Sequence, residues 1–211
     1  MTAIATPTEQ RFILDHADWD LYESLLRGVA DQHVFLTFDR GRLELMSPSW
    51  KHDLRSRRIA LLVMILAEEL DVPIIGGGST TFRSEGADAG LEPDQCFYVQ
   101  QVDAIRGKDE IDLASDPPPD LAIEVEITQR LSQREAVYAR LGVPELWRDD
   151  GQTLRIFLLQ PDGTYQQSDR GHAFQSITAT ALTALLNAAH QQDDITWTRS
   201  CRQWIQANVK Q

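Results

Sequence analysis

The chain has 211 residues, a hydrophobic fraction of 42% and a formal net charge of -12. This size and composition allow a sizeable core, and we expect a single domain over residues 1–211 with its core at about 15–200. The sequence has neither a run of about 18 apolar residues nor a signal-peptide pattern, which argues against a membrane span and predicts a cytoplasmic protein.

The first third of the chain predicts a short helix, a hairpin and one long helix. Helical spacing of apolar residues predicts the short helix over 18–26, and alternation predicts the hairpin over 34–45. A long helix is predicted from about Trp50 to Leu70, with Ser47 or Ser49 as its cap. We expect this helix to be the central packing helix.

The rest of the chain predicts strands mixed with helices. The predicted strands are 74–75, 80–83, 92–100, 120–128, 145–148, 155–160 and 164–167, and the predicted helices are 131–141, 178–190 and 200–209. Together these elements predict an α/β fold in which a mixed central sheet is flanked by helices.

Two separated acidic motifs carry the chemistry of the sequence, namely Glu92–Asp94 and Asp120–Glu126. In the second motif, strand alternation places Glu124 and Glu126 on one face and the apolar side chains on the other. Neighbouring carboxylates repel each other unless something positive or water lies between them, and hard cations prefer oxygen ligands. The motif therefore indicates either a metal site or an edge strand with one solvated face.

Four segments, in their order along the chain, resemble the Uma-two family of endonucleases in the PD-(D/E)xK, or restriction-endonuclease-like, superfamily. The segments are Gly41–Pro48, Glu92–Asp94, Pro119–Glu126 and Tyr138–Trp147. The resemblance covers roughly residues 15–200 and implies a restriction-endonuclease-like fold that hydrolyses phosphodiester bonds in DNA with Mg²⁺ or Mn²⁺. Comparison with nucleases that cut two strands implies a homodimer.

By motif, the resemblance assigns metal binding to Asp94 and Glu124. The superfamily lysine would lie two residues beyond Glu124, where this chain has Glu126. Glu126 is expected either to serve a second metal position, to orient water, or to form an ion pair with Arg134.

Arg134, four residues before Tyr138, is the candidate to replace the missing lysine. Arginine supplies positive charge, but its pKa prevents it from acting as a base, so we expect it to stabilise charge in the transition state. The alternative is an ordinary surface residue paired with Glu126 or Asp149.

Basic residues cluster near the start of the predicted long helix, although the chain as a whole is acidic. Lys51, Arg55 and Arg58 are expected to bind DNA phosphates. His52 is expected to contact a phosphate or a metal-bound water, unless it is a structural histidine. Glu44 is a further candidate acidic ligand or a residue of a solvated hairpin face.

Two functions therefore remain open from the sequence. One is a metal-dependent endonuclease with a variant active site. The other is a catalytically inactive nuclease-fold protein that acts as an assembly or regulatory module, which the glutamate at the lysine position and the acidic composition favour. An acyl-transfer hydrolase is not supported, because the chain has no Gly-x-Ser-x-Gly motif.

Overall fold

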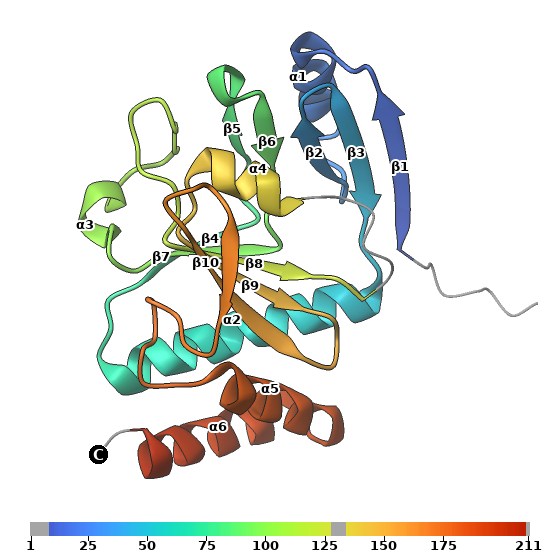
Figure 1. Ribbon diagram of the computed structural model, residues 1–211. Helices are drawn as coiled ribbons and strands as arrows, with labels where there is room; N and C mark the ends of the chain where they lie inside the picture. The colour runs from blue at the N-terminus through green and yellow to red at the C-terminus, as the bar shows by residue number, and fades with distance from the viewer. Residues whose placement is uncertain (1–8, 128–133, 210–211) are drawn as a thin grey trace, which may run out of the picture.

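Two β-sheets and six α-helices make up the computed structural model, which describes residues 9–127 and 134–209 (Figure 1). The five-stranded sheet has the spatial order β1 (Gln10–Asp15), β3 (Arg42–Ser47), β2 (Phe35–Asp39), β6 (Ala89–Leu91) and β5 (Phe82–Ser84). The six-stranded sheet has the order β11 (Tyr165–Ser168), β10 (Leu154–Leu159), β9 (Glu145–Asp149), β8 (Leu121–Val125), β7 (Gln95–Tyr98) and β4 (Ile75–Gly78). The helices are α1 (Trp19–Gly28), α2 (Trp50–Leu70), α3 (Val102–Ile105), α4 (Arg134–Leu141), α5 (Ala179–Ala188) and α6 (Asp194–Asn208).

The six-stranded sheet is mixed, because β8 and β9 pair in parallel while its other neighbouring strands pair antiparallel. One face of this sheet is covered by α2, and α5 and α6 pack against α2 (Figure 1). Leu121, Ile123 and Val125 of β8 belong to the apolar core on that side. The face assignment made from alternation is therefore correct, and the α/β class with a mixed sheet flanked by helices is confirmed.

Helix α4 lies between the two sheets. Its residues Val137 and Tyr138 share an apolar cluster with Ala122 of β8, on the face opposite α2, and with Phe82 and Leu91 of the five-stranded sheet. The side of β8 that carries Glu124 therefore faces a helix rather than solvent.

The long helix has the predicted bounds. Ser49 is its cap, since its hydroxyl accepts a hydrogen bond from the backbone N–H of His52, and Asp71 ends it in the left-handed region with φ 59°. The cap fixes the residue at which α2 begins, and His52 lies in the first turn. The cap therefore also fixes the position of the buried His52 side chain. None of the helices within residues 9–127 and 134–209 has the length and apolar content that a bilayer span requires.

Several elements differ from the sequence predictions. Strands β1 and β6, and with them a second sheet, were not predicted, because β6 has only three residues and the apolar residues of β1 are consecutive rather than alternating. The predicted strand over 92–100 begins at Gln95, so Asp94 lies just before β7. The part of the predicted helix over 131–133 lies outside the described residues.

Candidate active site

Asp94 and Glu124 come from separate motifs and lie close together in the fold. The antiparallel register of β7 and β8 pairs Gln95 with Ile123, so Asp94, one residue before β7, lies beside the end of β8 that carries Glu124. The backbone N–H of Asp94 donates to the carbonyl of Ile123 at 3.1 Å, and the N–H of Val125 donates to Asp94 Oδ2 at 2.6 Å. Both carboxylates belong to residues that are only 3% exposed.

Two side chains from one face of α4 hold the Glu124 carboxylate. Arg134 Nη2 lies 3.1 Å from Glu124 Oε1, and the Tyr138 hydroxyl donates to the same oxygen. Arg134 and Tyr138 are four residues apart, so one helix turn brings both to the same carboxylate. Arg134 also donates to the carbonyl of Glu92, while its Nε has no hydrogen-bond partner among the described residues.

Burial raises the pKa of Glu124 to about 8, with added repulsion from Asp94 and Glu126, while the charge of Arg134 and the hydrogen bond from Tyr138 act in the opposite direction. A carboxyl group with this pKa gains or loses its charge near neutral pH. A cation bound nearby would favour the charged form of Glu124 and so lower its pKa.

The raised pKa of Glu124 predicts a specific pH dependence of stability. Because the folded pKa of about 8 lies above the ordinary value of 4.5, the folded state binds this proton more tightly than the unfolded state. Relative to a Glu124→Gln variant, the wild type is expected to lose free energy of unfolding as the pH rises from about 4.5 to about 8. Urea unfolding of both proteins across this range, with a chelator present, measures the difference; a constant difference would contradict the raised pKa.

His52 is buried beside Asp94. Its Nε2 lies 3.2 Å from Asp94 Oδ2, and its Nδ1 lies 3.5 Å from Asp53 Oδ1. Burial lowers the pKa of His52, but the neighbouring Asp94, with contributions from Glu9 and Asp53, outweighs burial and raises it overall. Neither ring nitrogen has a hydrogen-bond partner among the described residues, so the contact of His52 with Asp94 is electrostatic.

Glu44 is buried next to this group rather than lying on a solvated hairpin face. Its Oε1 accepts a hydrogen bond from Arg11 Nη1 at 2.8 Å, and Arg11 Nε also donates to Glu9 Oε1 at 2.6 Å. The charges of Glu124, Asp94 and Glu44 raise the pKa of Arg134 against the effect of burial. Arg11 was missed in the sequence because β1 was not predicted, and no local pattern links it to Glu44.

Glu126, at the position of the superfamily lysine, forms an ion pair with Arg148 of β9 at 2.7 Å. Arg148 in turn pairs with Glu135 of α4. The expected pair between Glu126 and Arg134 is therefore wrong: the partner of Arg134 is Glu124. The surface role considered for Arg134 is also wrong, because the residue is buried.

The three basic residues predicted to bind DNA have different environments. Arg55 is buried and donates from Nε and Nη2 to the two carboxylate oxygens of Asp149, at 2.8 and 2.7 Å. The expectation that Arg55 contacts phosphate is corrected by this pairing, since helical periodicity turns it towards the sheet. Arg58 is largely buried and pairs with Asp194 of α6 at 3.2 Å, whereas Lys51 is exposed.

The matching family model bears the description "Putative restriction endonuclease", the Uma2 family, and covers residues 19–191. The chain therefore belongs to the Uma2 family. No curated protein matches this Uma2 chain. A similar solved structure is the crystal structure of "a putative nuclease belonging to DUF820" from Anabaena variabilis, with 15% sequence identity and a TM-score of 0.47, covering 72% of this chain and 90% of that chain.

The family match confirms the resemblance drawn from the four sequence segments, and its span includes both Asp94 and Glu124 as well as Arg134. Within residues 9–127 and 134–209 of this Uma2 protein, no group of three or more His, Cys, Asp or Glu side chains is arranged to hold a metal ion. The two acids that the resemblance assigns to a metal, Asp94 and Glu124, do not form such a group.

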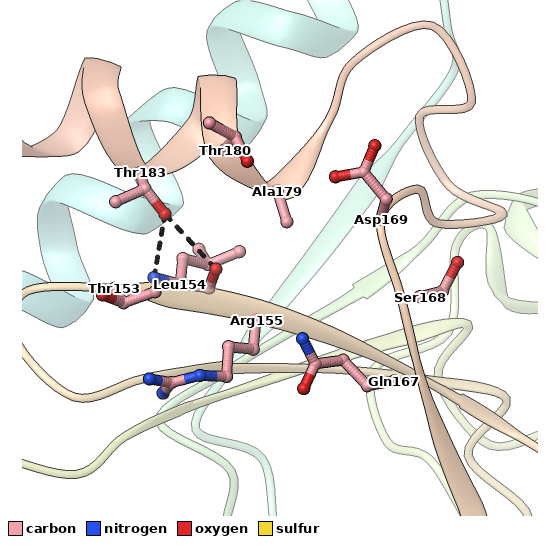
Figure 2. A pocket seen from close by; sticks show the side chains of 9 residues that line it. All are labelled: Thr153, Leu154, Arg155, Gln167, Ser168, Asp169, Ala179, Thr180 and Thr183. Carbon is pink, nitrogen blue, oxygen red and sulfur yellow. Dashed lines mark hydrogen bonds between the residues drawn. The ribbon is translucent and has the colours of Figure 1, made fainter.

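An open cavity of about 430 Å³ lies elsewhere in the Uma2 protein, between β10, β11 and the start of α5 (Figure 2). None of the predicted site residues lines it. Figure 2 shows Thr183 bridging to β10, where its hydroxyl accepts from the N–H of Leu154 at 3.0 Å. The Thr183 side chain thus joins α5 to the backbone of β10 in the cavity wall, and the acidic site is separate from it.

Proposed function

We propose that this Uma2 protein is a Mg²⁺- or Mn²⁺-dependent endonuclease that hydrolyses phosphodiester bonds in DNA. The observation that carries the proposal is that the buried Asp94 carboxylate lies against β8 at Val125, the residue after Glu124, with the guanidinium of Arg134 on Glu124. Membership in a family described as "Putative restriction endonuclease" supports the choice of reaction.

The donor atoms fit a hard divalent cation. Asp94 Oδ1 is buried and has no hydrogen-bond partner among the described residues, while its Oδ2 is held by the N–H of Val125. Mg²⁺ is commonly bound by one or two carboxylates, with water and substrate phosphate completing its coordination, so two protein ligands are sufficient. Asp94 and Glu124 would hold the ion. When bound, the metal would supply a water of lowered pKa and polarise the scissile phosphate.

The residues around Asp94 and Glu124 contact these carboxylates or carry positive charge. Tyr138 donates to Glu124, and the imidazole of His52 lies 3.2 Å from Asp94. Arg134 carries a positive charge at any physiological pH, which suits it to stabilise negative charge on a phosphate oxygen rather than to remove a proton. Its buried Nε–H has no partner among the described residues. Lys51, exposed at the start of α2, is placed to contact the DNA backbone.

The experiment is a nicking assay on supercoiled plasmid and single-stranded DNA with Mg²⁺, Mn²⁺ or Ca²⁺. The wild type is expected to cut with Mg²⁺ or Mn²⁺, and the Asp94→Asn plus Glu124→Gln variant is expected to lose at least about 100-fold in rate, since both proposed ligands lose their charge. Circular dichroism of the variant checks that it is folded. Equal activity of the two proteins would reject the proposal.

The alternative function is a catalytically inactive module with a nuclease fold. The observation that favours it is the closed set of ion pairs: Glu126 is paired with Arg148, and Arg134 already neutralises Glu124. Titration calorimetry separates the two functions. Binding of Mg²⁺ or Mn²⁺ by the wild type, abolished in Asp94→Asn, supports the endonuclease, and no binding at millimolar metal by a folded wild type supports the inactive module.

A further inference from the structure

Strand β1 differs from every other edge strand of the described chain. The edges of the two sheets are β1 and β5, and β11 and β4. The last three contain three or four residues each, whereas β1 contains six. Short edge strands limit pairing with other chains, so a long one is an available pairing edge.

Strand β1 also differs from the edge strand β11 in its exposed side chains, two of which are apolar. Phe12 is 63% exposed and Leu14 is 43% exposed, whereas the outward residues of β11 are two glutamines, Gln166 and Gln167. Strand β1 also contains no lysine or proline, the residues that commonly protect an edge. In Figure 1, β1 lies at the outer margin of the molecule.

The two exposed side chains continue an existing apolar layer. The register of β1 with β3 pairs Phe12 with Leu45 and Leu14 with Leu43, so these residues share the face of the sheet that α1 covers. Leu43 is fully buried under that layer, but the layer is left uncovered at β1. An added strand with apolar side chains would complete it.

The sequence of β1 is complementary to itself. If two copies pair antiparallel about Ile13, each Phe12 stands opposite a Leu14 of the other copy. Apolar pairs in direct register favour the pairing, and a two-fold axis forms each contact twice. Arg11 takes no part, because its side chain is largely buried and pairs with Glu9 and Glu44.

We propose that two copies of this chain form a homodimer by antiparallel pairing of their β1 strands, centred on Ile13, which joins the two five-stranded sheets into one. The inference does not depend on the nuclease function, because it concerns a surface formed by the outer edge of β1. It does place the dimer contact next to the site, since Arg11 of the same strand holds Glu44.

Sedimentation velocity of the full chain, without DNA or metal, tests the proposal. The wild type is expected to form a dimer at micromolar concentration. Phe12→Glu is expected to raise the dimer dissociation constant by more than about tenfold, because it places a charge in an apolar contact. Ile195→Glu is the matched control, since Ile195 is an equally exposed apolar residue, at 62%, in α6. A monomeric wild type, or equal effects of the two variants, would overturn the proposal.

Disulfide crosslinking at position 13, which lies on the proposed two-fold axis, provides a second test. The two native cysteines, Cys96 and Cys201, are buried, so a thiol introduced by Ile13→Cys is the accessible one. With oxidised glutathione as the oxidant, Ile13→Cys is expected to form a disulfide-linked dimer, and Gln166→Cys on the edge strand β11 is expected to remain monomeric on a non-reducing gel. A dimer that persists in Phe12→Glu, with no crosslink at position 13, would place the interface elsewhere and reject the β1 pairing.

Discussion

Replacing Arg134 with methionine is expected to abolish DNA cleavage and to destabilise the protein. Removing one partner of a buried ion pair typically costs about 3–5 kcal/mol when the remaining charge stays buried. Because burial raises the pKa of Glu124 to about 8 even with Arg134 in place, the full cost is expected only above that pH, and a smaller one where Glu124 is protonated. Loss of the transition-state charge is expected to lower the cleavage rate by about 100- to 1,000-fold. Urea unfolding and the plasmid nicking assay measure the two effects separately, provided that cleavage is measured where the variant is folded.

Two further variants separate charge from geometry at this position. Arg134→Lys keeps the positive charge and is expected to retain part of the activity, although lysine cannot reach Glu124 and the Glu92 carbonyl with the same planar fork. Arg134→Met combined with Glu124→Gln is expected to be more stable than Arg134→Met alone, because no buried carboxylate is then left unpaired. If Arg134→Met unfolds at the wild-type urea concentration, the ion pair contributes nothing to stability and the account of the site is wrong.

Replacing Arg55 with methionine is expected to destabilise the protein by about 3–5 kcal/mol, with no loss of DNA affinity by the folded fraction. The reason is that Arg55 joins α2 to the end of β9 through both oxygens of a buried Asp149. Asp149 also accepts from the N–H of Gly151 at 2.8 Å, so loss of the arginine leaves a partly satisfied buried carboxylate. Urea unfolding and a DNA-binding titration measure the two quantities.

Arg57→Met is the matched control for Arg55→Met. Arg57 lies on the same helix, its side chain is 66% exposed, and its ion-pair contact with Asp194 is 3.5 Å. An exposed pair of this kind contributes at most about 1 kcal/mol, so the control is expected to unfold close to the wild type. A folded Arg55→Met protein of wild-type stability that binds DNA more weakly would restore the original expectation that Arg55 contacts phosphate.

Local patterns in the sequence predicted the elements that support the site. The alternation in β8 separated the apolar residues from Glu124, and the serine and apolar spacing predicted the full length of α2. These signals are local, because strand alternation and helix caps involve residues only two to four positions apart. Strand β1 carried no such signal: its outward face is apolar, the reverse of the usual edge strand, so its sequence did not indicate its position.

The roles of the charged side chains were predicted less well, and the residues show why. Arg55 and Lys51 are four residues apart in one basic run, yet one is buried on Asp149 and the other is exposed. The choice between these environments depends on a carboxylate 94 positions further along the chain. No property of the basic run itself contains that information.

The sequence by itself determined the α/β class, the faces of β8, the length of α2, membership in the Uma2 family and the identity of the two candidate acids. Only the tertiary structure decided that Arg134 neutralises Glu124, that Arg55 holds Asp149, and that β1 forms an open apolar edge. The physical reason is that periodicity and capping act within a few residues, whereas the partner of a charge and the covering of an apolar face depend on which distant strands and helices pack together.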